Sequence, residues 1–145
     1  MLACDFVIAT PEASISLPEP KRGITAALVT PLLSYRLGAG RAGQLLLSGE
    51  PMSAETAQQA GLYYDLVDVD QLPARAARLI QQCLTCSPSA LAMTKQHLLK
   101  CAGSRLQQQL DDSIKVSASA RETADAREGL AAFLEKRKPR WDISR

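Results

Sequence analysis

The stretch SLPEPKRGI, residues 16–24, places a single carboxylate between two prolines. Pro18 fixes its own φ near about −65°, and Pro20 disfavours a helical conformation for the residue before it, so we expect an extended backbone at Glu19. A carboxylate held on a stiff backbone at the end of a strand is typical of a pre-organised catalytic group. A solvated glutamate in a proline-rich loop is the alternative, and these residues alone leave both interpretations open.

Short apolar or alternating runs on either side of this stretch indicate β-strands. Leu2–Ala9 is mostly apolar and predicts a buried strand, whereas Ser14–Leu17 alternates as a half-buried strand does. Leu62–Val69 favours a third strand or an extended arm, and Ile24–Val29 could start a helix. Two or three short strands cannot easily form an independent sheet, so the pattern indicates part of an α/β domain whose other strands are missing.

The sequence after residue 40 favours helices almost to its end. Ser53, Ser87 and Thr123 are predicted N-caps, and Pro88 stands where a first helical residue belongs. In the last helix, Leu130, Phe133 and Leu134 share one face. The predicted helices run over Arg41–Leu47, from Ser53 to Gly61, from Pro73 to about Cys86, from Ser87 to Gly103, from Ser104 onward, and from Thr123 to Pro139.

Composition excludes several classes of protein. The 145 residues carry 17 Lys plus Arg against 15 Asp plus Glu, and a net charge of +2 excludes a polybasic nucleic-acid binder. No apolar run reaches the roughly 18–20 residues that a membrane span needs, and Asp5 interrupts the one candidate signal segment, so neither a membrane partner nor a signal peptide is expected. Four cysteines are too few for a disulfide scaffold, which indicates reduced thiols and a cytoplasmic location.

Three further groups of residues could carry chemistry, and each has a plainer interpretation. Cys83 and Cys86 form a C-x-x-C pair, but the chain has one histidine, His97, and no second pair, so we expect structural thiols and no metal. The segment Lys136–Arg140 holds four cations in five residues. It either supplies favourable charge at a helix C-terminus or binds phosphates on a ligand.

Four motifs in order resemble the enoyl-CoA hydratase/isomerase (crotonase) family. They are Ala3-Cys4-Asp5 with residues 16–24, then residues 40–57 with Gly61-Leu62, then Pro88 with Ala90 and Lys95, and finally residues 127–139. The resemblance covers essentially the whole chain but only the C-terminal half or a little more of a family member. It implies an α/β fold, namely the C-terminal part of a crotonase-type ββα spiral. Residues 1–70 would be the remainder of the spiral core, and residues 71–145 a helical trimerisation region.

The resemblance also implies an activity and a site. Two backbone N–H groups of the family stabilise an enolate of an acyl-CoA thioester, and a carboxylate then moves protons. Glu19 matches the second of the two hydratase glutamates, whereas the oxyanion donors and the first glutamate would precede residue 1. Ile24 and Leu28 are expected to contact the substrate, although Thr25-Ala26-Ala27-Leu28-Val29 replaces the family's usual P-G-A-G-G loop and leaves the acyl group open. Phe133, Lys136 and Lys138 are expected at the CoA.

Three functions therefore stand side by side. The first is an acyl-CoA hydratase or double-bond isomerase of fatty acid metabolism, which needs no cofactor besides the CoA of its substrate and assembles as a homo-oligomer, a trimer or hexamer. The second is a non-catalytic, truncated oligomerisation fragment. The third is a basic helical binding module, which rests on the cationic tail alone.

Overall fold

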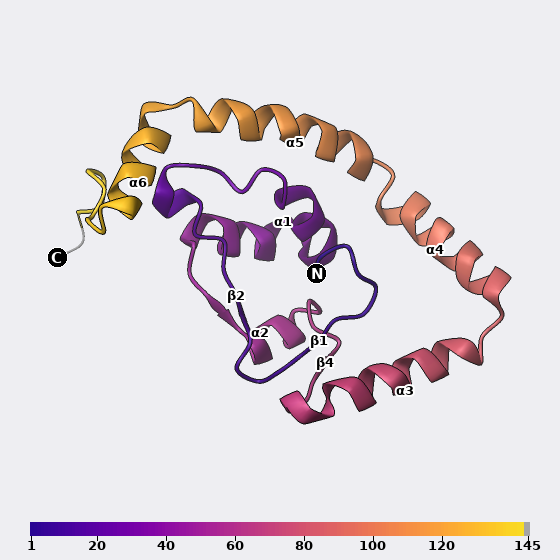
Figure 1. Ribbon diagram of the computed structural model, residues 1–145. Helices are drawn as coiled ribbons and strands as arrows, with labels where there is room; N and C mark the ends of the chain where they lie inside the picture. The colour runs from indigo at the N-terminus through magenta and orange to yellow at the C-terminus, as the bar shows by residue number, and fades with distance from the viewer. Residues whose placement is uncertain (144–145) are drawn as a thin grey trace.

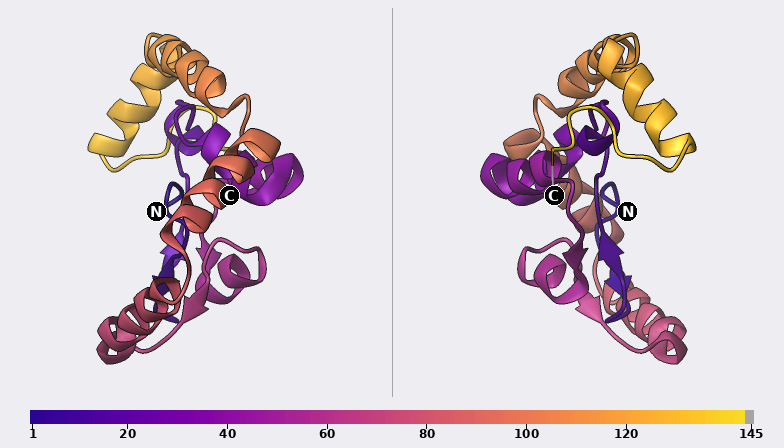
Figure 2. Two further views of the ribbon diagram at one scale, coloured as in Figure 1. Left: turned by 90° about the vertical axis from the view of Figure 1, so that its right-hand side faces the viewer. Right: turned by 90° about the vertical axis from the view of Figure 1, so that its left-hand side faces the viewer.

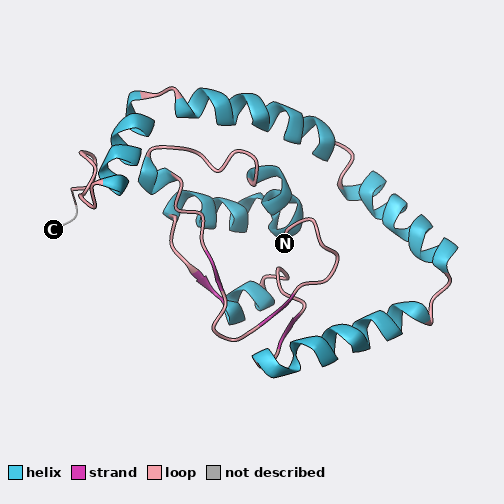
Figure 3. Cartoon of the chain, in the orientation of Figure 1, coloured by secondary structure: helices cyan, strands magenta, loops and turns pink. Residues whose placement is uncertain are grey.

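Helices make up most of the chain, and the strands are very short (Figure 1, Figure 3). The computed structural model describes residues 1–143. The helices are α1 (Thr30–Ser48), α2 (Ala54–Gln59), α3 (Leu72–Leu84), α4 (Pro88–Ala102), α5 (Leu106–Arg121) and α6 (Ala124–Leu134), with 3-10 turns η1 (Pro20–Arg22) and η2 (Val69–Gln71). The strands are β1 (Ile8–Ala9), β2 (Ser14–Ile15), β3 (Met52–Ser53) and β4 (Asp65–Leu66). The prediction of few short strands followed by a helical region is confirmed.

The strands pair in two separate two-stranded ladders. β1 runs parallel to β4, with Ile8 opposite Asp65, and β2 runs antiparallel to β3, with Ile15 opposite Met52. Each predicted strand was several residues long, and the structure keeps only two residues of each. A strand extends only as far as a partner strand accepts its backbone hydrogen bonds, and the apolar pattern by itself does not supply that partner.

The helix α1 differs from the prediction in where it begins, whereas its C-terminal end, at Ser48 with Gly49 as the cap, agrees with the predicted end near Leu47. Residues 24–26 have no regular structure and residues 27–29 form a turn, in which the N–H groups of Val29 and Thr30 donate to the carbonyl of Ala26. The predicted helix start at Ile24 is therefore wrong, and α1 begins at Thr30. Gly38 interrupts α1 with φ 73° and ψ 159°, and the predicted helix Arg41–Leu47 is the part after this kink. Only glycine adopts such a conformation readily.

The local start signals of three helices are confirmed. The hydroxyls of Ser53, Ser87 and Thr123 each accept a hydrogen bond from the backbone N–H three residues later. These contacts satisfy donors that the first turn of a helix leaves without partners. In α6, however, Leu130, Phe133 and Leu134 are exposed, and the buried face consists of Ala126, Gly129 and Ala132.

A single apolar cluster joins the N-terminal segment to α1 and α2. Leu33 and Leu62 are its fully buried large side chains, and Leu17 and Ala26 belong to it as well. Because Leu17 precedes η1 and Ala26 follows it, the core holds the stretch around Glu19 at both ends.

The last four helices form an arc around this core. In Figure 1 the chain runs through α3, α4, α5 and α6, and it returns beside the N-terminal segment at η1. Figure 2 shows α4 as a bridge between α3 at one end of the molecule and α5 and α6 at the other. α5 packs on α1 and α6 packs on η1, whereas α4 buries none of its residues. Within residues 1–143, no helix is both long and apolar enough to cross a bilayer.

Candidate functional site

Glu19 does not have the extended backbone that its neighbouring prolines predict. Its φ of −52° and ψ of −45° are helical, and it caps the start of η1. Its carbonyl accepts hydrogen bonds from the N–H of Arg22 at 2.9 Å and of Ile24 at 3.1 Å. These two bonds outweigh the steric preference imposed by Pro20, which disfavours this conformation without forbidding it.

The carboxylate of Glu19 is the unusual group of this loop. Its Oε2 atom is buried and has no hydrogen-bond partner among residues 1–143. Buried polar atoms are nearly always satisfied in folded proteins, because the loss of water without a replacement costs about 1–3 kcal/mol. A buried acceptor without a partner therefore marks a position where a proton or a ligand donor fits.

The C-terminal helix packs directly on the loop that carries this carboxylate. The Arg22 guanidinium stacks over the Phe133 ring, with its central carbon 4.2 Å from the ring centroid. The backbone of Gly129 in α6 lies against Arg22, and the backbone of Gly23 lies against Asp125. Sequence reasoning missed this packing, although an unexplained glycine in the middle of α6 was a usable signal.

Ion pairs fix the segment that follows α6. Arg137 donates to both carboxylate oxygens of Glu128, at 2.7 and 3.1 Å, and Nε of Arg140 lies 3.6 Å from Glu128. The Arg137 guanidinium holds the pKa of Glu128 below its ordinary value near 4.5, although burial acts in the opposite direction. Arg137 also pairs with Glu135. Arg137 and Arg140 of the predicted patch are therefore engaged in intramolecular pairs, and Lys138 is not free either.

The predicted substrate residues differ in how exposed they are and in whether they contact the loop that carries Glu19. Ile24 is half-buried and is tied to Glu19 through the backbone, whereas Leu28 is 47% exposed in the turn before α1. Phe133 is 56% exposed beside Arg22. Lys136 leaves α6 in the left-handed conformation, with φ 54°, and Lys138 is exposed in the tail. Within residues 1–143, no hydrogen bond, ion pair or ring contact joins Leu28 or Lys136 to Glu19.

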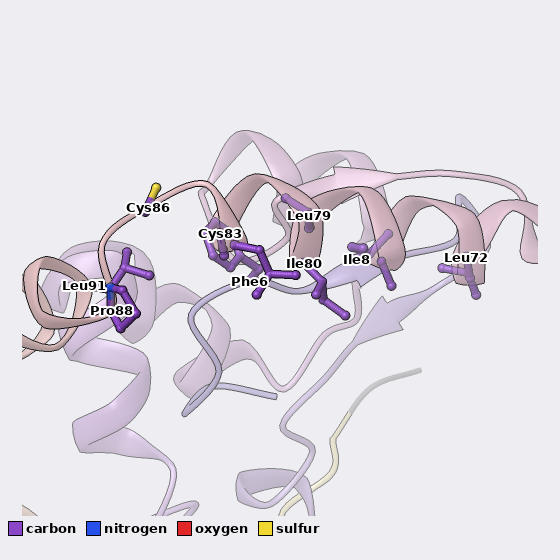
Figure 4. A pocket seen from close by; sticks show the side chains of 11 residues that line it. Phe6, Ile8, Leu72, Leu79, Ile80, Cys83, Cys86, Pro88 and Leu91 are labelled. Atoms are coloured by element: carbon purple, nitrogen blue, oxygen red, sulfur yellow. The ribbon is translucent and has the colours of Figure 1, made fainter.

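An apolar cavity of about 750 Å³ lies elsewhere, between β1, α3 and the start of α4 (Figure 4). Its lining includes Phe6, Ile8, Leu79 and Leu91, together with Cys83 of the C-x-x-C pair. All four cysteines are free thiols. Among residues 1–143, no group of three or more His, Cys, Asp or Glu side chains could hold a metal ion. The cavity therefore offers mainly hydrophobic contact, and its lining includes the thiols of Cys83 and Cys86 but no carboxylate, histidine or lysine.

Comparison with known families gives one match across the chain. The family described as enoyl-CoA hydratase/isomerase matches residues 1–144. The 2,3-dehydroadipyl-CoA hydratase of Escherichia coli is 37% identical over 139 residues, which are 95% of this chain and 54% of that protein. The mevalonyl-coenzyme A hydratase of Aspergillus fumigatus is 34% identical over 98% of this chain and 54% of its own length. The chain spans about half the length of these relatives.

Solved structures give the same result. A carnitinyl-CoA dehydratase from Mycobacterium avium superposes with a TM-score of 0.87 at 30% identity, over 99% of this chain and 57% of that one. An enoyl-CoA hydratase from Mycobacterium avium gives a TM-score of 0.86 at 32% identity, over 97% of this chain and 55% of that one. The arrangement of helices and short strands seen here is therefore that of about half of such a protein.

Proposed function

The chain belongs to the enoyl-CoA hydratase/isomerase family, and from this premise we propose that it carries the proton-transfer half of an acyl-CoA hydratase site. The observation that carries the proposal is the buried carboxylate oxygen of Glu19, which has no partner among residues 1–143. The relatives described above are named as hydratases or a dehydratase of CoA thioesters, which favours hydration over double-bond isomerisation.

Glu19 acts at the carbon next to the thioester carbonyl. Addition of water to the β carbon of an enoyl-CoA places electrons on the thioester as an enolate, while a second carboxylate, supplied from outside residues 1–145, takes a proton from that water. Glu19 in its acid form gives its own proton to the α carbon. Two backbone N–H groups that stabilise the enolate are supplied from outside residues 1–145. General acid catalysis contributes typically about 10²–10⁴-fold, and each oxyanion donor about 10²–10³-fold, so neither half suffices alone.

The CoA portion contacts α6 and the segment after it. Phe133 presents an exposed ring, and within residues 1–143 the Lys136 ammonium makes no hydrogen bond or ion pair, so it remains available for phosphate. Lys138 adds positive charge in the same tail. Ile24 and Leu28 line the acyl side, and the reaction uses no cofactor beyond the CoA of the substrate. The cytoplasmic location and the role in fatty acid metabolism stay predictions.

A hydration assay with crotonyl-CoA tests the proposal. The chain would be assayed alone and in a chimera that carries the remaining half of the Escherichia coli relative before residue 1. We expect turnover only in the chimera, and Glu19→Gln should lower its kcat by about 10²–10⁴-fold. Glu12→Gln, an exposed carboxylate of the same segment, is the matched control and should leave kcat unchanged.

Two results would contradict the proposal. Full activity of the chimera with Glu19→Gln would remove Glu19 from the chemistry. A folded, CoA-binding chimera without any turnover would favour the second candidate, a non-catalytic oligomerisation fragment. The exposed apolar side chains of α4 and α5, including Met93, Leu98, Leu99 and Ile114, are the observation behind that second candidate.

A further inference from the structure

Two glycines bring backbone directly against backbone where α6 crosses η1. A Cβ atom on Gly129 would overlap the carbonyl of Arg22 and would lie 2.9 Å from the N atom of Gly23. A Cβ atom on Gly23 would likewise overlap the carbonyl of Asp125. The atoms in the way belong to the backbone and cannot swing aside as a flexible side chain can. This contact therefore requires glycine at both positions.

Other glycines of the chain show that Gly129 has a specific reason to be in a helix. Gly40 and Gly43 lie in α1, and nothing stands within 4 Å of a Cβ built on either residue. Glycine inside a helix costs about 1 kcal/mol relative to alanine. At Gly129 that cost is offset by the close approach of α6 to η1, and the small neighbours Ala126 and Ala132 on the same buried face extend it.

The helix α6 contacts Arg22 and Gly23, which are hydrogen-bonded through their backbone to Glu19 and to its neighbour Pro20. The N–H groups of Arg22 and Ile24 donate to the Glu19 carbonyl, and the N–H of Gly23 donates to Pro20. A shift of Arg22 and Gly23 away from α6 would therefore carry the Glu19 backbone with it. On the other side of Glu19, Leu17 is anchored in the apolar core and cannot follow.

We propose that Gly129 and Gly23 are positioning residues, which let α6 clamp η1 and so orient the Glu19 carboxylate for proton transfer. This inference rests on the acid/base role proposed above for Glu19. Any side chain at Gly129 forces α6 and η1 apart. A misplacement of about 1 Å in a catalytic group can lower the rate about 10²-fold, so the clamp has a measurable consequence.

A double-mutant cycle in the chimera described above separates positioning from general destabilisation. Gly129→Ala should lower kcat by about 10²-fold with little change in KM. In a Glu19→Gln background the same substitution should change kcat by less than about twofold, because the group it positions is already removed. Gly43→Ala, the matched control in α1, should leave kcat unchanged in both backgrounds. Equal losses from Gly129→Ala in both backgrounds would overturn the inference.

Two readouts on the 145-residue chain do not depend on activity. The carbon-13 resonance of the Glu19 carboxylate, assigned by its absence in Glu19→Gln, should shift in Gly129→Ala and stay in place in Gly43→Ala. Trp141 is the only tryptophan, and its ring atom Cη2 lies 2.9 Å from where a Gly23 Cβ would stand. Acrylamide should therefore quench the fluorescence of Trp141 more strongly when α6 moves away from η1.

These readouts also separate the inference from the proposed function. If Glu19→Gln keeps full activity, the proposed function fails. The carbon-13 resonance of Glu19 then still tests whether Gly129 positions the carboxylate, and an unshifted resonance in Gly129→Ala would overturn that inference. If Gly129→Ala does not fold, Arg22→Leu is the milder variant, since it removes the stacking on Phe133 but adds no atom at the glycine contact. It should give a smaller loss of kcat that again disappears with Glu19→Gln, and an equal loss in both backgrounds would contradict the clamp.

Discussion

A substitution at Lys136 can remove the charge of its side chain without changing its backbone conformation. Its φ of 54° costs any L-residue about 1–2 kcal/mol, so Lys136→Gln keeps this cost and removes only the charge. If the ammonium binds a CoA phosphate, Lys136→Gln should weaken CoA binding by about fivefold at low ionic strength. The difference should shrink as salt is added, because the Debye length falls to about 10 Å at 0.1 M.

Titration calorimetry with CoA at two salt concentrations measures this effect. Lys115→Gln is the control, because it removes the same charge from α5. The Nζ atom of Lys115 lies 3.8 Å from Oδ1 of Asp112. An unchanged dissociation constant for Lys136→Gln at low ionic strength would remove Lys136 from the CoA site.

Glu128 gives the protein a pH dependence with a defined sign. Its folded-state pKa lies below its ordinary value near 4.5, chiefly because of the Arg137 hydrogen bonds. A lowered carboxylate pKa stabilises the folded state above pH 4.5, and this contribution fades as the pH falls through the folded-state pKa. Wild type should therefore exceed Glu128→Gln in thermal stability near neutral pH, and the two should converge in acid.

Melting curves followed by circular dichroism across this pH range provide the test. Glu122→Gln is the control, since Glu122 is exposed at the start of the α5–α6 connection. A constant difference in Tm between wild type and Glu128→Gln at all pH values would show that the ion pair does not carry the effect.

At the level of the element, two of the glycines in α1, Gly38 and Gly40, have opposite requirements. Gly38 has φ 73° and ψ 159°, a region where an alanine side chain costs roughly 1–3 kcal/mol. Gly40 lies in the helix after the kink with open space around its Cβ position, so alanine there should stabilise the fold by about 1 kcal/mol. Urea midpoints should therefore move down for Gly38→Ala and up for Gly40→Ala. Stabilisation by both substitutions would mean that α1 straightens at Gly38 without cost.

The elements also show which features a sequence determines locally. The caps at Ser53, Ser87 and Thr123 were predictable, because each depends on a hydroxyl and a backbone N–H three residues away. The strand lengths were not, because a ladder such as Ile8 opposite Asp65 joins residues far apart in the chain. The prolines predicted an extended Glu19, and the hydrogen bonds of η1 overruled that local preference.

The candidate site also combines features that the local sequence determines with features that depend on distant residues. Its carboxylate could be singled out from the sequence, because two prolines beside one acid are unusual. The partner of Gly129 could not be located from the sequence, because its contact with Arg22 joins the loop that carries Glu19 to a helix more than a hundred residues later. A hydrophobic pattern points to Leu130 and Leu134, whereas close backbone contact selects the small residues on the other face of α6.

At the scale of the whole molecule, the chain exposes more surface than a compact protein of its mass. Its accessible area is 9,992 Å² for 15.6 kDa. A compact monomer of this mass exposes roughly 7,200 Å², so the excess is more than about a third. The helix α4 accounts for part of this excess area, since every residue of α4 is exposed. Its Lys95 forms a surface ion pair with Asp5, with Nζ 2.7 Å from Oδ2. Such a surface predicts association with a further protein surface.

The exposed apolar residues predict where association between copies occurs. Leu98 and Leu99 on α4 and Ile114 on α5 are each more than half exposed, and they lie within residues 71–145, the helical region expected to form a homo-oligomer. We expect the protein to form trimers or hexamers through these helices. Leu98→Glu should shift the mass measured by light scattering toward the monomer at micromolar concentration, because a buried unpaired carboxylate opposes association. Gln59→Glu places the same charge at an exposed position of α2, outside that region, and should leave the oligomer intact. A monodisperse monomer of the wild-type chain would contradict the prediction, and equal dissociation by both variants would place the interface elsewhere.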